Sequence, residues 1–208
     1  MMSAPLSSSS RPIQRQRLHL LSWPLLAAAS AALSGCSKSE DGAKLAEPAG
    51  MAPAQAYEKV AIEGKGFVVG SLMSANPVFV LFDPQCPHCG HLWSSAQPLL
   101  NKVKFVWIPV SFINGKSAPQ GAAILSAPNP AEFMAAHEAS LLAGTGGAPV
   151  VGAMSPETEA TIKANTVLFN SLKVESVPYV IAKNPKSGAV VTNAGAMETA
   201  ALATFLGV

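Results

Sequence analysis

The apolar run from Val78 to Phe82 is the clearest structural signal in the chain. Its residues are β-branched, aromatic or leucine with no polar position among them, which predicts a buried strand rather than one face of a helix. After a break at residues 83–84, apolar residues recur at helical spacing over residues 92–100 and predict a helix at about residues 87–101. Pro98 lies inside that helix, where we expect it to cause a kink.

The other apolar segments predict a mixed α/β domain. We expect strands at residues 67–72, 104–110, 177–183 and 189–192, and helices at residues 56–62, 119–126, 130–143, 156–172 and 197–206. The helix at about residues 87–101 joins the strands at residues 78–82 and 104–110 as a βαβ unit. These two strands are therefore expected to be parallel with a right-handed crossover. The short connection at residues 184–188 predicts an antiparallel hairpin. The helices over about residues 119–172 lie between strands, which indicates an insertion into a sheet domain.

The first 56 residues predict export and tethering. Three arginines, an apolar run over residues 18–33 and the small residues before Cys36 are typical of a signal peptide at residues 1–35. The segment Leu33-Ser34-Gly35-Cys36 resembles the bacterial lipobox, which implies that Cys36 is lipidated and anchors the chain to a membrane. An ordinary cleavage site and an uncleaved anchor are the alternatives. Residues 36–56 are polar and rich in Ala, Pro and Gly and predict a flexible tether, which leaves residues 57–208 as the folded domain.

The charge balance changes once the signal is removed. Three of the 14 Lys and Arg residues lie in the signal, so 11 remain against 12 Asp and Glu, a net charge of −1. No basic patch remains to favour nucleic acid as a partner. Outside the cytoplasm, the two remaining cysteines lie where disulfides persist.

Those two cysteines form the motif Cys86-Pro87-His88-Cys89 where the strand meets the helix. The N–H groups of the first helical turn have no intrahelical partner and the helix dipole is positive there, so a Cys86 thiolate would be stabilised and its pKa lowered. We therefore expect an exposed, charged sulfur at Cys86 with Cys89 beneath it. Pro87 suits the first helical turn and His88 adds a donor or a positive charge, so both are expected to tune the redox properties.

Other interpretations of the motif fit the sequence less well. A structural disulfide would close a very short loop and remove little chain entropy. A zinc site needs four ligands, whereas the mature chain offers these two thiols plus His88, His91 and His137. Covalent haem needs a histidine where the chain has Gly90. His137 has no partner nearby in sequence and is interpreted as a surface or packing residue. We expect no metal and no cofactor beyond a Cys86–Cys89 disulfide.

The order of elements resembles the α/β thioredoxin fold, with a helical insertion between the βαβ unit and the Val-Pro strand. Within it, the segment Phe82-Asp83-Pro84-Gln85-Cys86-Pro87-His88-Cys89 followed by Trp93 and Pro98 is similar to the DsbC/DsbG branch of periplasmic thiol:disulfide oxidoreductases. The segment at residues 121–130 adds to this resemblance, which covers about residues 66–208.

The resemblance implies roles for particular residues. Cys86 matches the attacking thiol and Cys89 the resolving thiol. Val177-Pro178 matches a loop whose proline is cis and faces the cysteines, leaving the Val177 backbone free to bind an extended substrate. The start of an edge strand is the alternative interpretation of this pair.

Three departures from the branch matter, and the first two favour an oxidant over an isomerase. Only residues 57–76 lie between the tether and the core, too few for the dimerisation domain of the isomerases, so we expect a monomer. Pro87-His88 and Val177 resemble the oxidase DsbA instead. Val80 stands where thioredoxin keeps a buried aspartate as a proton shuttle, which argues against a reductase of that type.

The sequence therefore predicts a thiol:disulfide oxidoreductase that acts on exported proteins. Its partner for resetting the redox state would be a membrane protein of DsbB or DsbD type. The alternatives are a DsbG-like reductase or isomerase that protects or repairs cysteines of envelope proteins, and a Cu(I)-binding lipoprotein in which the two thiolates hold copper.

Overall fold

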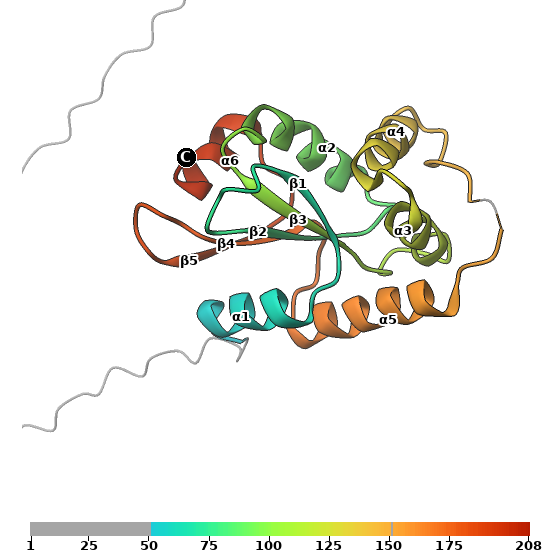
Figure 1. Cartoon of the computed structure of the whole chain (residues 1–208), viewed down its shortest axis with the longest axis horizontal. Helices are drawn as coiled ribbons and strands as arrows, with labels where there is room; N and C mark the ends of the chain where they lie inside the picture. The colour runs from blue at the N-terminus through green and yellow to red at the C-terminus, as the bar shows by residue number, and fades with distance from the viewer. Residues whose placement is uncertain (1–50, 151) are drawn as a thin grey trace, which may run out of the picture. The chain divides into compact units, whose positions relative to one another are not determined.

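The computed structural model describes residues 51–150 and 152–208. Its elements (Figure 1) are α1 (Pro53–Glu63), β1 (Phe67–Gly70), β2 (Val78–Phe82), α2 (Pro87–Ala96), the 3₁₀ helix η1 (Gln97–Leu99), β3 (Lys104–Pro109), α3 (Ser117–Ser126), α4 (Pro130–Leu142), α5 (Pro156–Ser171), β4 (Tyr179–Lys183), β5 (Val190–Ala194) and α6 (Thr199–Leu206). The expected signal peptide, Cys36 and most of the expected tether lie outside the described residues. Within the described part, no helix is long and apolar enough to span a membrane.

The strands form one five-stranded sheet in the order β1-β3-β2-β4-β5. β2 and β3 are parallel, with Val80 opposite Trp107, as the βαβ interpretation predicted. β4 and β5 form the predicted antiparallel hairpin, and β1 pairs antiparallel with β3. All five residues of β2 are buried, because this strand is central in the sheet and helices cover both faces.

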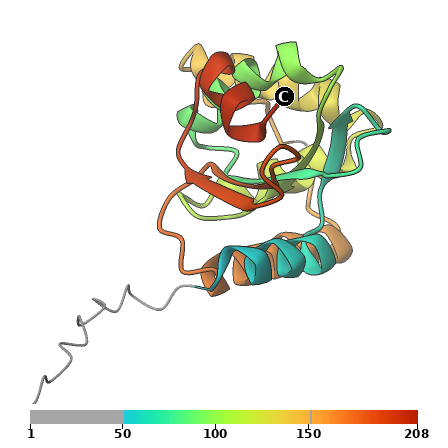
Figure 2. The same ribbon diagram turned by 90° about the vertical axis from the view of Figure 1, so that its left-hand side faces the viewer.

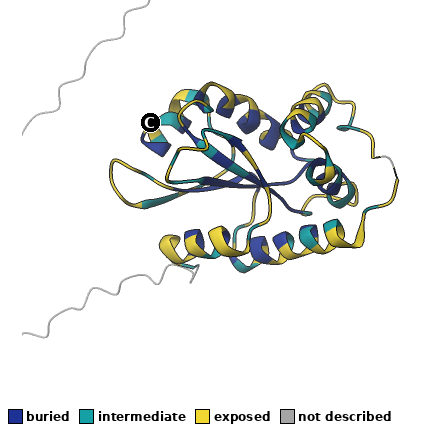
Figure 3. Ribbon diagram, viewed as in Figure 1, coloured by how far each residue is buried: buried dark blue, intermediate teal, exposed yellow. Residues whose placement is uncertain are grey.

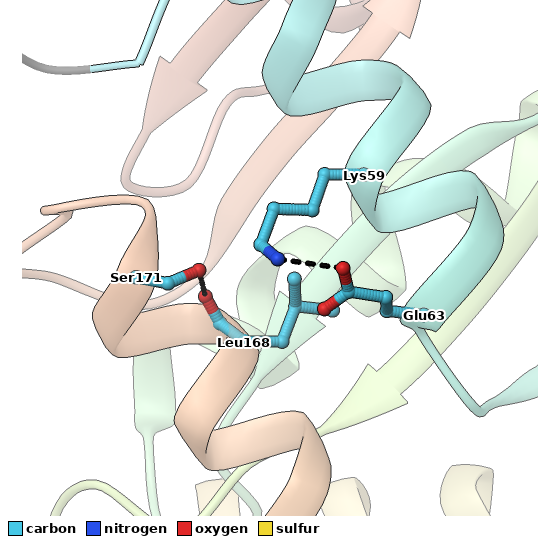
Figure 4. Close-up of polar contacts among 4 residues, drawn as sticks. All are labelled: Lys59, Glu63, Leu168 and Ser171. Atoms are coloured by element: carbon cyan, nitrogen blue, oxygen red, sulfur yellow. Dashed lines mark hydrogen bonds and ion pairs between the residues drawn. The ribbon is translucent and has the colours of Figure 1, made fainter.

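Helices α2 and α6 cover one face of the sheet, and α1 and α5 cover the other (Figures 1 and 2). The inward sides of α1 and α5 are buried and their outward sides exposed (Figure 3). On α1, Tyr57 packs edge-on against Phe79 of the central strand, with ring centroids 5.3 Å apart. Where α1 passes α5, the exposed Lys59–Glu63 ion pair lies beside Leu168 and Ser171 (Figure 4).

An aromatic cluster fixes α2 against the sheet. Trp93 of α2 lies 5.1 Å from Trp107 of β3, measured between ring centroids, and Trp107 lies 5.7 Å from Phe82 of β2. All three side chains are buried. Edge-to-face packing of such large rings holds the start of α2 in a fixed place at the end of β2.

The expected helical insertion is present as α3 and α4, whereas α5 also packs against β3 and α1 and so belongs to the sheet layers. Two helices begin with a side-chain cap: the Asn129 side chain accepts a hydrogen bond from the Glu132 N–H at the start of α4. The Ser155 side chain does the same with the Thr158 N–H at the start of α5.

Several predicted boundaries were wrong. α2 ends at Ala96 instead of continuing through a kink, because Pro98 has no N–H to donate and the chain tightens into η1. α1 begins at Pro53, so residues 53–56 are helical and not tether, and Ala56 is buried against the domain. β4 begins at Tyr179, after the Val-Pro pair.

Candidate active site

Asp83 organises the loop between β2 and α2 with a completely buried carboxylate. Its Oδ2 accepts hydrogen bonds from the N–H groups of Phe112 (2.6 Å) and Ile113 (2.9 Å), and its Oδ1 accepts one from Gln85 N–H (2.7 Å). The Asp83 carbonyl accepts from Cys86 N–H at 3.0 Å. Hydrogen bonds to a carboxylate are strong, so Asp83 positions the backbone from which Cys86 projects. The sequence identified this residue only as part of the strand break.

Cys86 is the N-cap residue of α2, and Pro87 follows at the first helical position, as predicted. The pKa of Cys86 is lowered from 9.0 to about 6, first of all by a hydrogen bond from the Cys89 thiol. Burial opposes this shift, while the backbone N–H groups of Cys89 and His88 and the charge of His88 add to it. The backbone N–H groups at the start of the helix thus add to the stabilisation of the thiolate, in the direction that the sequence predicted.

Cys89 has the opposite environment. Its exposed fraction is 0%, and its pKa is raised well above 9.0 by burial, by the hydrogen bond and charge of Cys86 and by the charge of Glu138, against a lowering backbone contact from Asp83. Both cysteines are free thiols. The site therefore pairs one sulfur that ionises readily with a second that stays protonated.

The expectation of an exposed Cys86 sulfur was wrong, because the exposed fraction of Cys86 is only 4%. The Val177 carbonyl covers it and accepts a hydrogen bond from the Cys86 thiol at 3.5 Å. Pro87 and His88 are exposed beside it and form the surface of the site. This contact covers the sulfur while Cys86 is a protonated thiol, whereas the thiolate and the disulfide have no S–H to donate to the Val177 carbonyl.

The Val177-Pro178 peptide bond is cis, as the resemblance implied, and both residues are buried beside Cys86. The expectation of a free Val177 carbonyl was wrong for this dithiol form, since the carbonyl already binds the Cys86 thiol. The same contact joins the loop before β4 to the start of α2, two segments that lie 91 residues apart in the sequence.

His137 is buried under the active-site loop and is thus a packing residue, one of the two roles expected for it. The Ala148 N–H donates to its Nδ1 at 3.1 Å, so Nε2 carries the proton and donates to the Pro84 carbonyl at 2.7 Å. Burial lowers the pKa of His137, with smaller opposing effects from Pro84 and Asp83. A neutral imidazole therefore ties α4 to the loop that carries Cys86.

Glu138, the next residue of α4, is a buried acid that the sequence analysis missed. Its exposed fraction is 1%, and its pKa is raised from 4.5 to about 9 by burial and then by the charges of Cys86 and Asp83. The buried positions of α4 are Met134, His137 and Glu138, spaced i, i+3 and i+4. A charged residue on the core-facing side of a helix is the signal that could have revealed it.

Metal ligands are not clustered in the part of the chain that the structure describes. No group of three or more His, Cys, Asp or Glu side chains is close enough there to hold a metal ion. His88 and His91 are exposed on α2, with ring centroids 6.2 Å apart.

The sheet order, the dithiol at the start of α2 and the adjacent cis-proline loop define a thioredoxin-like protein with a redox-type cysteine pair. The crystal structure of a periplasmic thioredoxin-like protein from Salmonella enterica serovar Typhimurium has the same fold, with a TM-score of 0.56 over 75% of this chain and 96% of that chain at 17% identity. Likeness at this identity shows the fold alone.

Sequence comparison relates the chain to thiol:disulfide interchange proteins. It is 26% identical to the protein DsbG of Pseudomonas aeruginosa over 132 residues, 62% of this chain and 50% of that protein. It is 30% identical to DsbG of Escherichia coli over 105 residues, 50% of this chain and 42% of that protein. The chain thus matches half or less of the length of these curated relatives. No family model matches it.

Proposed function

We propose that the protein is a periplasmic thiol:disulfide oxidoreductase that oxidises exported proteins through Cys86 and Cys89. The opposite pKa shifts of the two thiols carry this proposal, because the stabilised Cys86 thiolate is the better leaving group of the two. Cys86 is also the less buried of the two cysteines. The interchange activity of the DsbG relatives supports the same chemistry.

In the oxidising direction a substrate thiolate attacks the Cys86 sulfur of the Cys86–Cys89 disulfide. The sulfur–sulfur bond breaks, Cys89 leaves with the electron pair and takes up a proton, and a mixed disulfide joins the substrate to Cys86. A second substrate thiolate attacks the substrate sulfur of this bond and expels the Cys86 thiolate. The substrate loses two electrons and the protein gains them, to be passed on to a membrane oxidant of DsbB type. Val177 and Pro178 bind the substrate backbone beside Cys86.

The lowered pKa of Cys86 favours the oxidation of substrate thiols, and the size of its effect on the redox potential can be calculated. At pH 7 a fall from 9.0 to about 6 stabilises the dithiol by about 1.4 kcal/mol, which makes the couple more oxidising by about 30 mV. A DsbG-like reductase or isomerase, supplied with electrons by a partner of DsbD type, is the second candidate. The sequence similarity to DsbG favours it.

The redox equilibrium of the mature chain with glutathione separates these candidates. We expect a potential closer to about −120 mV than to about −270 mV, the values typical of a strong oxidase and of thioredoxin. Between pH 6 and 9 the potential should fall by about 30 mV per pH unit instead of about 59, because the reduced form then binds one proton. Cys86→Ser should abolish exchange. A potential near that of thioredoxin would favour the reductase.

The site is proposed to act at a membrane surface, through a lipid on Cys36, as a monomer. Residues 57–63 lie in α1, which packs on the sheet of the same chain, and this packing supports the proposal of a monomer. Light scattering of the purified mature chain should give the mass of one copy. Metabolic labelling with a fatty-acid analogue should mark the full chain and not Cys36→Ala.

A further inference from the structure

Glu138 has no partner that accounts for its burial. Both carboxyl oxygens are buried, and neither has a hydrogen-bond partner among residues 51–150 and 152–208. Buried polar groups are nearly always hydrogen-bonded, because an unpaired one loses its interaction with water and gains nothing in return. A carboxyl group kept in such a place destabilises the fold, which points to a role in the chemistry of the site.

The carboxyl lies against the start of α2, immediately after Cys89. A Cβ atom added to Gly90 would be 2.6 Å from Glu138 Oε2 and 3.2 Å from Leu142 Cγ. The carboxyl thus occupies the space that a side chain at position 90 would fill. Figure 1 shows the two helices, α2 and α4, side by side.

The ionisable groups around Glu138 are acidic or already engaged. Cys86, Cys89 and Asp83 act on it electrostatically, and all three carry negative charge when ionised. His137 is bound on both ring nitrogens, and His88 and His91 of α2 are exposed. Helix α3 and strand β1, which also pack against α4, contain no titratable residue. Nothing in these surroundings favours a permanent carboxylate.

We propose that Glu138 exchanges a proton with the Cys89 sulfur during disulfide exchange, an inference that rests on the proposed function. When a substrate thiolate breaks the Cys86–Cys89 bond, the Glu138 carboxyl gives its proton to the departing Cys89 thiolate and becomes a carboxylate. In the reverse reaction the carboxylate takes the proton from the Cys89 thiol, which then attacks Cys86 and expels the substrate thiolate. Neither carboxyl oxygen is hydrogen-bonded to the Cys89 sulfur, so the proton passes through one water.

The acidities of the two groups fit this transfer. The pKa of Glu138 is raised to about 9, so at pH 7 it holds a proton to give. Burial is the largest cause of the raised pKa of Cys89 and persists when Cys86 is bonded to substrate, so the departing Cys89 thiolate is a strong base. Without the transfer, Cys89 would leave as a buried, unpaired thiolate, which a site of low polarity disfavours.

The test is the rate at which reduced glutathione opens the disulfide of the mature protein, measured by stopped flow from pH 6 to 10 and corrected for the glutathione thiolate fraction. Glu138→Gln keeps the shape but cannot give up a proton in this way, and we expect it to react at least about tenfold more slowly at pH 7. Glu159→Gln removes an exposed carboxyl from α5 and should match the wild type.

The pH profile separates proton transfer from a structural role. The corrected wild-type rate should fall as Glu138 loses its proton, at a pH no higher than about 9, because the Cys86 charge that raises its pKa is absent in the disulfide. The fall should be absent in Glu138→Gln and present in Glu138→Asp. A wild-type profile without the fall overturns the inference even if Glu138→Gln does not fold.

Three further outcomes would count against it. A Glu138→Gln rate equal to the wild type, or slower with an unchanged profile, overturns the role of Glu138 while leaving the proposed function intact if Cys86→Ser still blocks exchange. A wild-type disulfide that does not react with glutathione at all overturns both.

Discussion

Lowering the pH from 8 to 5 should destabilise the dithiol form of the protein through the Cys86 sulfur. The pKa of Cys86 is about 6 in the folded protein, mainly because the Cys89 thiol donates a hydrogen bond to it, against 9.0 for an ordinary thiol. Between these values Cys86 binds more protons in the unfolded chain than in the folded one, so its contribution to stability rises with pH. Glu138, whose pKa is raised by folding, contributes with the opposite sign. The Cys86 contribution is complete above about pH 9 and is lost as the pH falls through about 6.

The size of the effect follows from this pKa difference. Linkage gives a thiolate contribution to the free energy of unfolding of about 2.5 kcal/mol at pH 8, about 1.4 kcal/mol at pH 7 and close to zero at pH 5. Cys86 is nearly buried, so solvent does not screen the interaction strongly. A change of about 2.5 kcal/mol is a large part of the stability of an ordinary domain.

Guanidinium unfolding of the reduced mature chain at pH 5, 7 and 8 measures this change. Cys86→Ala is the matched control, because it removes the thiolate and keeps Cys89, His137 and Glu138. The His137 titration, to which Cys86 does not contribute, then cancels in the difference between the two proteins. The Cys86 charge raises the pKa of Glu138, so the comparison is made with Glu138→Gln present in both proteins. Thiolate absorbance at 240 nm, followed over the same range, gives the Cys86 pKa independently. Equal pH dependence in both proteins, or an absorbance midpoint above about 7.5, would refute the reasoning.

Three substitutions test the buried polar groups, each by guanidinium unfolding near pH 7. Asp83→Asn should cost about 2–3 kcal/mol, because its amide cannot accept from all three backbone N–H groups that bind the carboxylate; an unchanged stability would contradict its positioning role. Asn165→Ala should cost about 2–4 kcal/mol, since Asn165 joins the Lys65 and Pro109 backbones; a loss below about 1 kcal/mol would show that water replaces it. Glu138→Leu should gain about 1–3 kcal/mol by removing an unpaired carboxyl, and a loss would show that it has a partner.

The parts of the site that local sequence determines were predicted well. The strand at residues 78–82 has the predicted bounds. Its uninterrupted apolar run indicates a buried strand, and the Asp-Pro pair that follows marks the end of that strand. Cys86 caps α2 as expected because Pro87 can only begin a helix there. The cis bond at Val177-Pro178 came from family resemblance, because the sequence alone favours trans.

The parts that depend on tertiary contacts were not predicted. The low exposure of Cys86 arises from the Val177 carbonyl, whose position is fixed by the pairing of β4 with β2. Pro98 can either kink a helix or end it, and the local sequence does not distinguish these outcomes. The structure shows that α2 ends at Ala96. To predict that Glu138 is buried, one has to know which side of α4 faces α2. No local sequence pattern shows which side of α4 that is. The spacing of four residues between Met134 and Glu138 indicates only that both lie on the same side of the helix.

The two buried carboxyl groups of the site, Asp83 and Glu138, differ in whether they have hydrogen-bond partners. Asp83 precedes Cys86 in the chain and its carbonyl binds the Cys86 N–H, whereas Glu138 lies against Gly90, which follows Cys89. The Asp83 side chain is bound by three N–H groups, so it serves as a fixed anchor. Glu138 has no such donors, so a carboxylate there is unstable and a proton must be present most of the time. An acid that holds its proton beside a thiol that must gain and lose one is suited to transfer, whereas the satisfied Asp83 is suited only to hold the loop.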